Sequence, residues 1–245
     1  MDDAPHEWKI RAGALPVAVA LALLFHSWDL GHFAQRTALT MPLHELGHAI
    51  TGWWCGFAAV PTLWKTMIPE TRGVIVPVVL LAASGYVGWR GWTTDRMGLV
   101  ALAGAALALQ FLGTVASSVD SAHEMFTFGG DAGAMVLGTV LMMLFFVGPE
   151  SKLRAGGLRY GLLGIGAAAL VDTFATWWRA RKDHDVIPFG EIEGVGLSDP
   201  SKLDEVYGWT VPQIVDRYVM VGTVCVLALV AVWVRATWIT YRDAH

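Results

Sequence analysis

Residues 38–58 read ALTMPLHELGHAITGWWCGFA, an apolar stretch that is long enough for a membrane-crossing helix and also holds two histidines and a glutamate. Its central motif is His44-Glu45-Leu46-Gly47-His48. Side chains four residues apart on an α-helix lie on the same face, so both imidazoles can reach one Zn²⁺ ion, with Glu45 beside them as a general base. This HExxH pattern is typical of zinc hydrolases. The alternative is a helix whose histidines only hydrogen-bond to their neighbours.

The rest of the chain is similarly apolar. Of its 245 residues, 55% are hydrophobic and 16% are charged, and the mean hydropathy is +0.50. This composition favours a polytopic membrane protein. We therefore expect an all-α transmembrane helical bundle with six or seven membrane segments, forming a single membrane domain over residues 1–245. The apolar runs lie near residues 12–28, 38–58, 73–89, 98–118, 132–148, 157–178 and 218–238.

The charge of the chain excludes one class of partner. With a formal net charge of −4 and a pI near 6.0, the chain has no basic surface for nucleic acid. Lys and Arg divide almost equally between the two sides of a seven-span arrangement, so they leave the orientation in the membrane open. Cys55 and Cys225 lie in or beside apolar runs, where a free thiol packs as a small hydrophobic group.

A polar stretch, residues 179–216, separates the last two apolar runs, and we expect it to form an extramembrane loop. Within it, residues 199–209 read DPSKLDEVYGW. Proline at the start and glycine near the end predict a short helix. This helix is either part of a folded cap at the membrane surface or a dock for a substrate or partner.

A catalytic zinc usually takes three protein ligands and keeps a fourth position for water, so His44 and His48 need one more ligand. Four candidates, Asp120, His123, Glu124 and Asp131, follow the fourth apolar run. Asp131 leads directly into the next apolar run and has glycines on both sides, which permit an unwound entry and close backbone approach. A helix-capping aspartate explains the local sequence equally well.

Together these residues resemble the site-2 protease family of intramembrane zinc metalloproteases, in its compact branch without a PDZ domain. The resemblance covers roughly residues 30–150. It implies that His44 and His48 bind Zn²⁺, that Asp131 is the third ligand, and that Glu45 is the catalytic base. It further implies hydrolysis of a peptide bond in or near a transmembrane segment of a membrane-protein substrate, and a place in the lipid bilayer of a prokaryotic inner membrane.

The resemblance also constrains the topology, because the family's histidine helix and aspartate helix run parallel. Here segments 73–89 and 98–118 lie between them, and two full crossings would make the helices antiparallel. Segment 73–89 is the better candidate for a re-entrant element, since Pro77 and Ser84-Gly85 interrupt it. Alternatively, the zinc helix starts near His32, which would place His44 and His48 deeper in the membrane.

Two other functions remain open. The first is that of a non-catalytic protease-like subunit or scaffold, which binds partners in a larger membrane complex. The second is that of a membrane redox protein with haem or di-iron. In the redox hypothesis the ligands would come from His26, His32, His44, His48 and His123. Glu45 has no role in a haem site, and visible absorbance of the purified protein distinguishes the two metal-binding classes.

Overall fold

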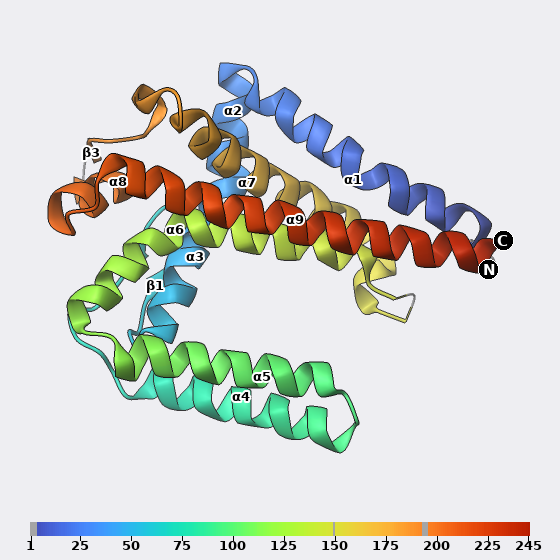
Figure 1. Ribbon diagram of the computed structural model, residues 1–245, viewed down its shortest axis with the longest axis horizontal. Coiled ribbons are helices and arrows are strands. Elements are labelled where there is room, and N and C mark those ends of the chain that lie inside the picture. The colour runs from blue at the N-terminus through green and yellow to red at the C-terminus, as the bar shows by residue number, and fades with distance from the viewer. Residues whose placement is uncertain (1–3, 149, 193–195) are drawn as a thin grey trace. The chain divides into compact units, whose positions relative to one another are not determined.

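The computed structural model describes residues 4–148, 150–192 and 196–245, and its described part is predominantly helical, which confirms the all-α class (Figure 1). The chain divides into two compact units. The first comprises Met1–His44 and Asp131–His245, and the second comprises Glu45–Gly130. One boundary falls within α3 (Met41–Trp54) and the other within α6 (Val119–Met143). The expectation of a single membrane domain stays a prediction.

In the first unit, three long helices pack against one another: α1 (Ala4–His26), α7 (Leu158–Ala180) and α9 (Val211–Ala244) (Figure 1). The shorter helical elements are α2 (Asp29–Gln35), the π-helix η1 (Arg36–Thr40), and the 3-10 turns η3 (Leu144–Phe146) and η4 (Lys152–Gly157).

The segment between α7 and α9 is folded, as expected for a cap. It contains η5 (His184–Val186), strands β3 (Glu191–Ile192) and β4 (Gly196–Leu197), α8 (Asp199–Ser201) and the π-helix η6 (Lys202–Val206). The two strands pair antiparallel, with Glu191 opposite Leu197. The predicted short helix is confirmed: Ser198 caps it, Pro200 lies in its first turn, and Gly208 follows it at φ +70°.

Helical structure continues without a break from α2 through η1 into α3. Helical structure begins at Asp29, as in the alternative in which the HExxH helix starts near His32, whereas the depth of His44 and His48 in a membrane stays a prediction. The wide turn of η1 lies just before the motif, and such π-bulges are frequent at functional sites. The run ends at Trp54, and Gly56 follows at φ +89°, a conformation that terminates helices.

Glycines bring α6 and α7 into close contact in the first unit. A Cβ atom on Gly138 would lie 2.8 Å from the carbonyl oxygen of Gly166, and a Cβ atom on Gly166 would collide with Gly138 in return. Close to this contact, Leu43, Ala134 and Ala169 form a buried apolar cluster. Small residues at a helix interface let the backbones approach, which is the usual way helices associate in lipid.

A buried charge cluster connects the ends of three elements in the first unit. The Glu7 carboxylate accepts hydrogen bonds from Arg11 Nε at 3.0 Å and from Arg159 Nη1 at 2.8 Å. Arg11 also donates to the carbonyl oxygens of Phe146 and Val147, which follow the end of α6. The cluster therefore satisfies the charges that α1 and α7 bury near their first turns.

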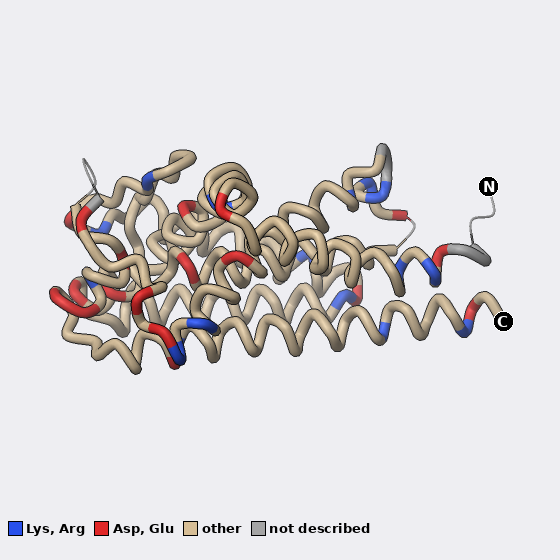
Figure 2. The backbone as a smooth tube through the Cα atoms, turned by 90° about the horizontal axis from the view of Figure 1, so that it is seen from above, with Lys and Arg blue, Asp and Glu red and all other residues tan. Residues whose placement is uncertain are grey.

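Among the described residues, five helices are long and apolar enough to cross a membrane, which is compatible with an integral membrane protein. They are Glu7–His26, Met97–Ala116, Val119–Phe146, Leu158–Ala180 and Val211–Ala244. The expected count of six or seven is not supported. Figure 2 shows a long stretch of α9 without charged residues, and Val224 and Leu227 on it are 60% and 65% exposed. Such surface suits contact with lipid.

In the second unit, α4 (Ile75–Thr93) and α5 (Met97–Gln110) form an antiparallel helical hairpin, and the π-helix η2 (Phe111–Ala116) extends α5 (Figure 1). The interruption that we expected in segment 73–89 is absent. Pro77 lies in the first turn of α4, where proline is tolerated, and Ser84-Gly85 continue the helix. Whether α4 crosses a membrane stays a prediction, because it is not among the five helices above.

A short loop sheet and a partly buried arginine complete the second unit. Strands β1 (Val60–Pro61) and β2 (Thr66–Met67) pair antiparallel, with Pro61 opposite Thr66. Arg72 donates to the carbonyl oxygens of Cys55 and Gly113 and to Ser117. These bonds fix the chain that leaves α3 against the end of η2.

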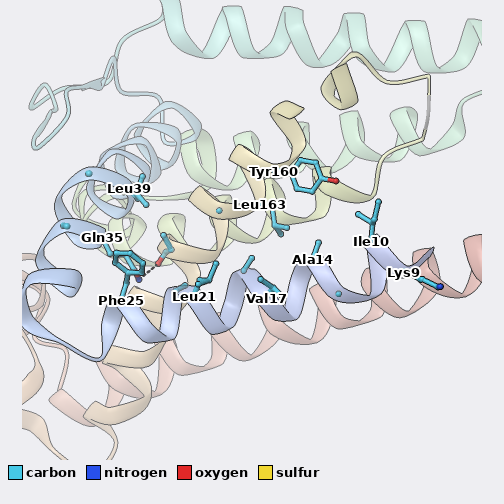
Figure 3. Close-up of a pocket in the computed structure, with 17 residues that line it drawn as sticks. Lys9, Ile10, Ala14, Val17, Leu21, Phe25, Gln35, Leu39, Tyr160 and Leu163 are labelled. Carbon is cyan, nitrogen blue, oxygen red and sulfur yellow. Dashed lines mark hydrogen bonds between the residues drawn. The ribbon is translucent and has the colours of Figure 1, made fainter. Parts of the chain in front are cut away.

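An apolar cavity of about 820 Å³ lies in the first unit among α1, α2, η1 and α7. Figure 3 shows Val17, Leu21, Leu39 and Leu163 among its lining side chains. At its edge, Gln35 Nε2 donates to the carbonyl oxygen of Ala168 at 3.1 Å. Because the surface of the lining is mainly apolar, hydrocarbon suits the cavity better than ordered water.

The close contact of α6 with α7 leads to a prediction about stability. We expect Gly166→Leu to destabilise the protein by roughly 3 kcal/mol or more, because the added side chain meets backbone atoms that cannot move aside. Thermal unfolding in detergent measures the loss. Gly161→Leu on the same helix is the control, since no atom lies within 4 Å of a Cβ atom there. Equal unfolding temperatures for the two variants would contradict the close contact.

Candidate metal centre

Helix α3 carries the three residues of the HExxH motif, and all three are buried. His44, Glu45 and His48 are 8%, 4% and 5% exposed. Since α3 is one continuous helix, the two histidines lie on one face by helix geometry alone. An ionisable triad buried in an apolar helix requires specific partners.

Within the first unit, His44 lies against Asp131. The distance from His44 Nδ1 to Asp131 Oδ1 is 2.9 Å. Trp177 Nε1 donates to the other oxygen of Asp131 at 2.8 Å, and Arg36 Nη2 lies 3.5 Å from Oδ1. Asp131 is thus buried with a partner for each oxygen, which is how a carboxylate holds a histidine ring in a fixed orientation.

The second ring nitrogen of His44 faces Asp199, a residue that the sequence analysis did not single out. His44 Nε2 lies 3.2 Å from Asp199 Oδ2. A neutral imidazole carries one N–H and cannot donate to carboxylates on both sides. The arrangement therefore suits either an imidazolium or a cation between Nε2 and Asp199. The sequence placed Asp199 only at the start of the short helix, before Pro200, and that position does not indicate ligation; the capping residue is Ser198.

The local structure at Asp131 differs from the sequence expectation. We expected Asp131 at the head of a membrane helix with an unwound entry, but α6 begins at Val119 and is helical through Gly129 and Gly130. Gly129 instead permits close approach, because a Cβ atom there would overlap Thr51. Packing, rather than helix unwinding, accounts for this glycine.

Asp120, His123 and Glu124 were the other candidates for the third ligand, and they lie in the first turns of α6, in the second unit. The His123 ring packs edge-on against Phe57, with centroids 4.6 Å apart. Asp120 is exposed. His123 therefore has a packing role in the structure, and a ligand role for any of the three stays a prediction.

Within the second unit, Glu45 and His48 each have a partner. Thr66 Oγ1 lies 2.8 Å from Glu45 Oε2 and 2.8 Å from the Glu45 carbonyl oxygen, so its single hydroxyl proton can serve either. His48 Nδ1 lies 2.7 Å from the Phe126 carbonyl oxygen, and the two rings stack. Since a carbonyl only accepts, Nδ1 of His48 carries the proton, and Nε2 is then the ring nitrogen through which this histidine would bind a metal.

Cys55 agrees with the expectation of a buried free thiol. It packs with Phe57 and Ala122 in the apolar cluster of the second unit. Cys55 therefore has a packing role in this cluster.

The hydrogen bond from Trp177 to Asp131 leads to a second prediction about stability. We expect Trp177→Phe to destabilise the protein by roughly 1.5–3 kcal/mol, since it removes a donor from a buried charged acceptor. Trp233→Phe is the matched control, because Trp233 Nε1 donates to a neutral acceptor, the Arg11 carbonyl oxygen, and should cost only about 0.5–1.5 kcal/mol. Chemical unfolding in detergent compares them, and an equal or smaller loss for Trp177→Phe would argue against a charged Asp131.

The resemblance to site-2 proteases rests on the HExxH residues and Asp131. Comparisons with protein-family models, curated proteins and solved structures found no match. Membership of that family stays a prediction.

Proposed function

We propose that the chain is an intramembrane zinc metalloprotease of site-2 type, which hydrolyses a peptide bond in or near a transmembrane segment of a membrane-protein substrate. As the resemblance implies, we assign it to a prokaryotic inner membrane. The observation that carries the proposal is the buried His44 ring with a carboxylate at each nitrogen, Asp131 at Nδ1 and Asp199 at Nε2. Five apolar helices support the membrane location.

The donor set fits zinc, which favours imidazole nitrogen and carboxylate oxygen in a four-coordinate site. His44 and His48 would each supply Nε2, because their Nδ1 atoms face Asp131 and the Phe126 carbonyl. Two aspartates are candidates for the third ligand. Asp131 is the ligand that the resemblance implies, but it lies at Nδ1 of His44, whereas Asp199 lies at the Nε2 side, where the metal would bind. If Asp199 binds the metal, Asp131 orients His44 instead.

Bound zinc would act as a Lewis acid on the peptide carbonyl and lower the pKa of the attacking water. Glu45 would accept a proton from that water and transfer it to the leaving amine. The Thr66 hydroxyl would hold the Glu45 carboxylate in place through its contact with Oε2. The substrate would be a membrane segment unwound enough to expose its backbone carbonyl, since a helix keeps its carbonyls hydrogen-bonded.

Metal analysis tests the site. We expect His44→Ala to lose one equivalent of zinc per chain relative to the wild type, as measured by elemental mass spectrometry of detergent-purified protein. Asp131→Asn and Asp199→Asn should both weaken zinc binding. Loss of a carboxylate that only orients a ligand costs about 10–100-fold in zinc affinity, less than loss of a ligand. The variant with the weaker zinc binding therefore identifies the third ligand. Unchanged zinc in His44→Ala would refute the site. Iron in place of zinc would favour the redox hypothesis.

Cleavage tests the activity. The wild type and Glu45→Gln are expressed separately in the same bacterial host, and the new protein N-termini of the membrane fraction are mapped by mass spectrometry. We expect N-termini within transmembrane segments that depend on the wild-type protein and are absent with Glu45→Gln. Identical N-termini in both strains, together with bound zinc, would instead support the non-catalytic subunit or scaffold.

Thr66 provides a finer test of the proton-transfer step. We expect Thr66→Val to lower the yield of those N-termini by roughly 10-fold, the effect of about one hydrogen bond, while zinc content is unchanged. Thr66→Ser keeps the hydroxyl and should restore cleavage. Full activity in Thr66→Val would show that Glu45 does not need this contact.

A further inference from the structure

A second group of metal-type ligands lies in the first unit and shares no residue with the HExxH motif. His26 ends α1, His32 lies in α2, and Asp172 lies in α7. His26 Nδ1 is 3.3 Å and His32 Nε2 is 2.8 Å from the same oxygen, Asp172 Oδ1. One ligand atom from each residue lies within 4.8 Å of the other two. Three separate helices thus converge on one point.

Asp172 is the most constrained member, because it is completely buried. Its Oδ2 accepts a hydrogen bond from Arg36 Nη1 at 3.3 Å. Its Oδ1, like His26 Nδ1, makes no hydrogen bond of acceptable geometry within the described part of the chain, although both histidine nitrogens are close to it. A buried carboxylate oxygen without a hydrogen bond is costly, and a cation would relieve that cost.

The charges around this group also favour a cation. The side chain of Arg36 spans two buried aspartates, with Nη1 at Asp172 and Nη2 at Asp131. One guanidinium neutralises only one of these two carboxylates. If His26, His32 and His44 are neutral, Arg36 and the two aspartates together keep a net negative charge in an apolar helical unit, where uncompensated charge is expensive.

We propose that His26, His32 and Asp172 form a second divalent-metal site, with Zn²⁺ as the ion that the ligands suit best. Two imidazole nitrogens and one carboxylate oxygen are a usual three-ligand set for zinc. Bond lengths near 2.1 Å place tetrahedral ligand atoms about 3.4 Å apart. The separation of His26 Nδ1 from Asp172 Oδ1, 3.3 Å, matches this value, and that of His32 Nε2, 2.8 Å, would have to widen when the ion binds. The hydrogen bond from Arg36 to Oδ2 leaves Oδ1 as the single ligand oxygen, as an outer-shell partner does.

The position of the site indicates its effect. The side chain of His32 is 44% exposed, so an ion can enter from that side and keep a solvent ligand. The bound ion would hold the turn between α1 and α2 against α7 and stabilise the first unit. Because Arg36 contacts both Asp172 and Asp131, the ion would also fix the guanidinium that lies beside the partner of His44.

The experiment separates this site from the one proposed above by removing the HExxH ligands first. The double variant His44→Ala/His48→Ala is purified in detergent, stripped with a chelator and titrated with Zn²⁺. We expect it to bind one equivalent per chain and to gain thermal stability when it does. Adding either His32→Ala or Asp172→Asn to the double variant should abolish the binding of this one zinc ion per chain. Adding His184→Ala is the control, since this exposed histidine belongs to neither site.

Each outcome of the zinc titration either supports or overturns the second metal site. One equivalent in the double variant that disappears with His32→Ala establishes the second site, even if the wild type shows no proteolysis. No zinc in a double variant that retains its helical circular dichroism overturns it, as does an equivalent that survives both His32→Ala and Asp172→Asn. Because Asp172→Asn keeps the shape of the side chain, it guards against loss of folding as the cause.

Discussion

The first unit depends on the requirement that carboxylates buried in an apolar helical unit have charged or hydrogen-bonding partners. Asp131 and Asp172 are both buried, and Arg36 contacts both. An unpaired charge there would cost several kcal/mol. This constraint determines which elements meet, because Arg36 precedes α3 whereas the aspartates lie on α6 and α7. It also accounts for the Trp177 hydrogen bond to Asp131.

Small residues make these polar contacts possible. The approach of α6 to α7 at Gly138 and Gly166 brings the buried aspartates of two helices within reach of one guanidinium. In the second unit the same requirement has a local solution, since Thr66 on a two-residue strand reaches Glu45 of α3. In both units, therefore, the way the elements pack decides which buried polar groups find a partner.

Sequence patterns predicted the features that depend on near neighbours. The apolar runs indicated an all-α chain, and residues 199–209 indicated a short helix, because helical periodicity and capping are local properties. The helix start at Asp131 was wrong for a related reason. Glycines near an aspartate favour a break locally, but α6 is helical through them, and Gly129 instead permits the close approach of α6 to Thr51.

By itself, the sequence determined that His44, Glu45 and His48 share a helix and that the chain is apolar enough for a membrane, since both follow from spacing and composition. Only the tertiary structure decided which carboxylates face the histidines. Asp131 and Asp199 are separated from His44 by 87 and 155 residues, and His26 and His32 are separated from Asp172 by 146 and 140. Such contacts arise from helix packing, which no local pattern encodes.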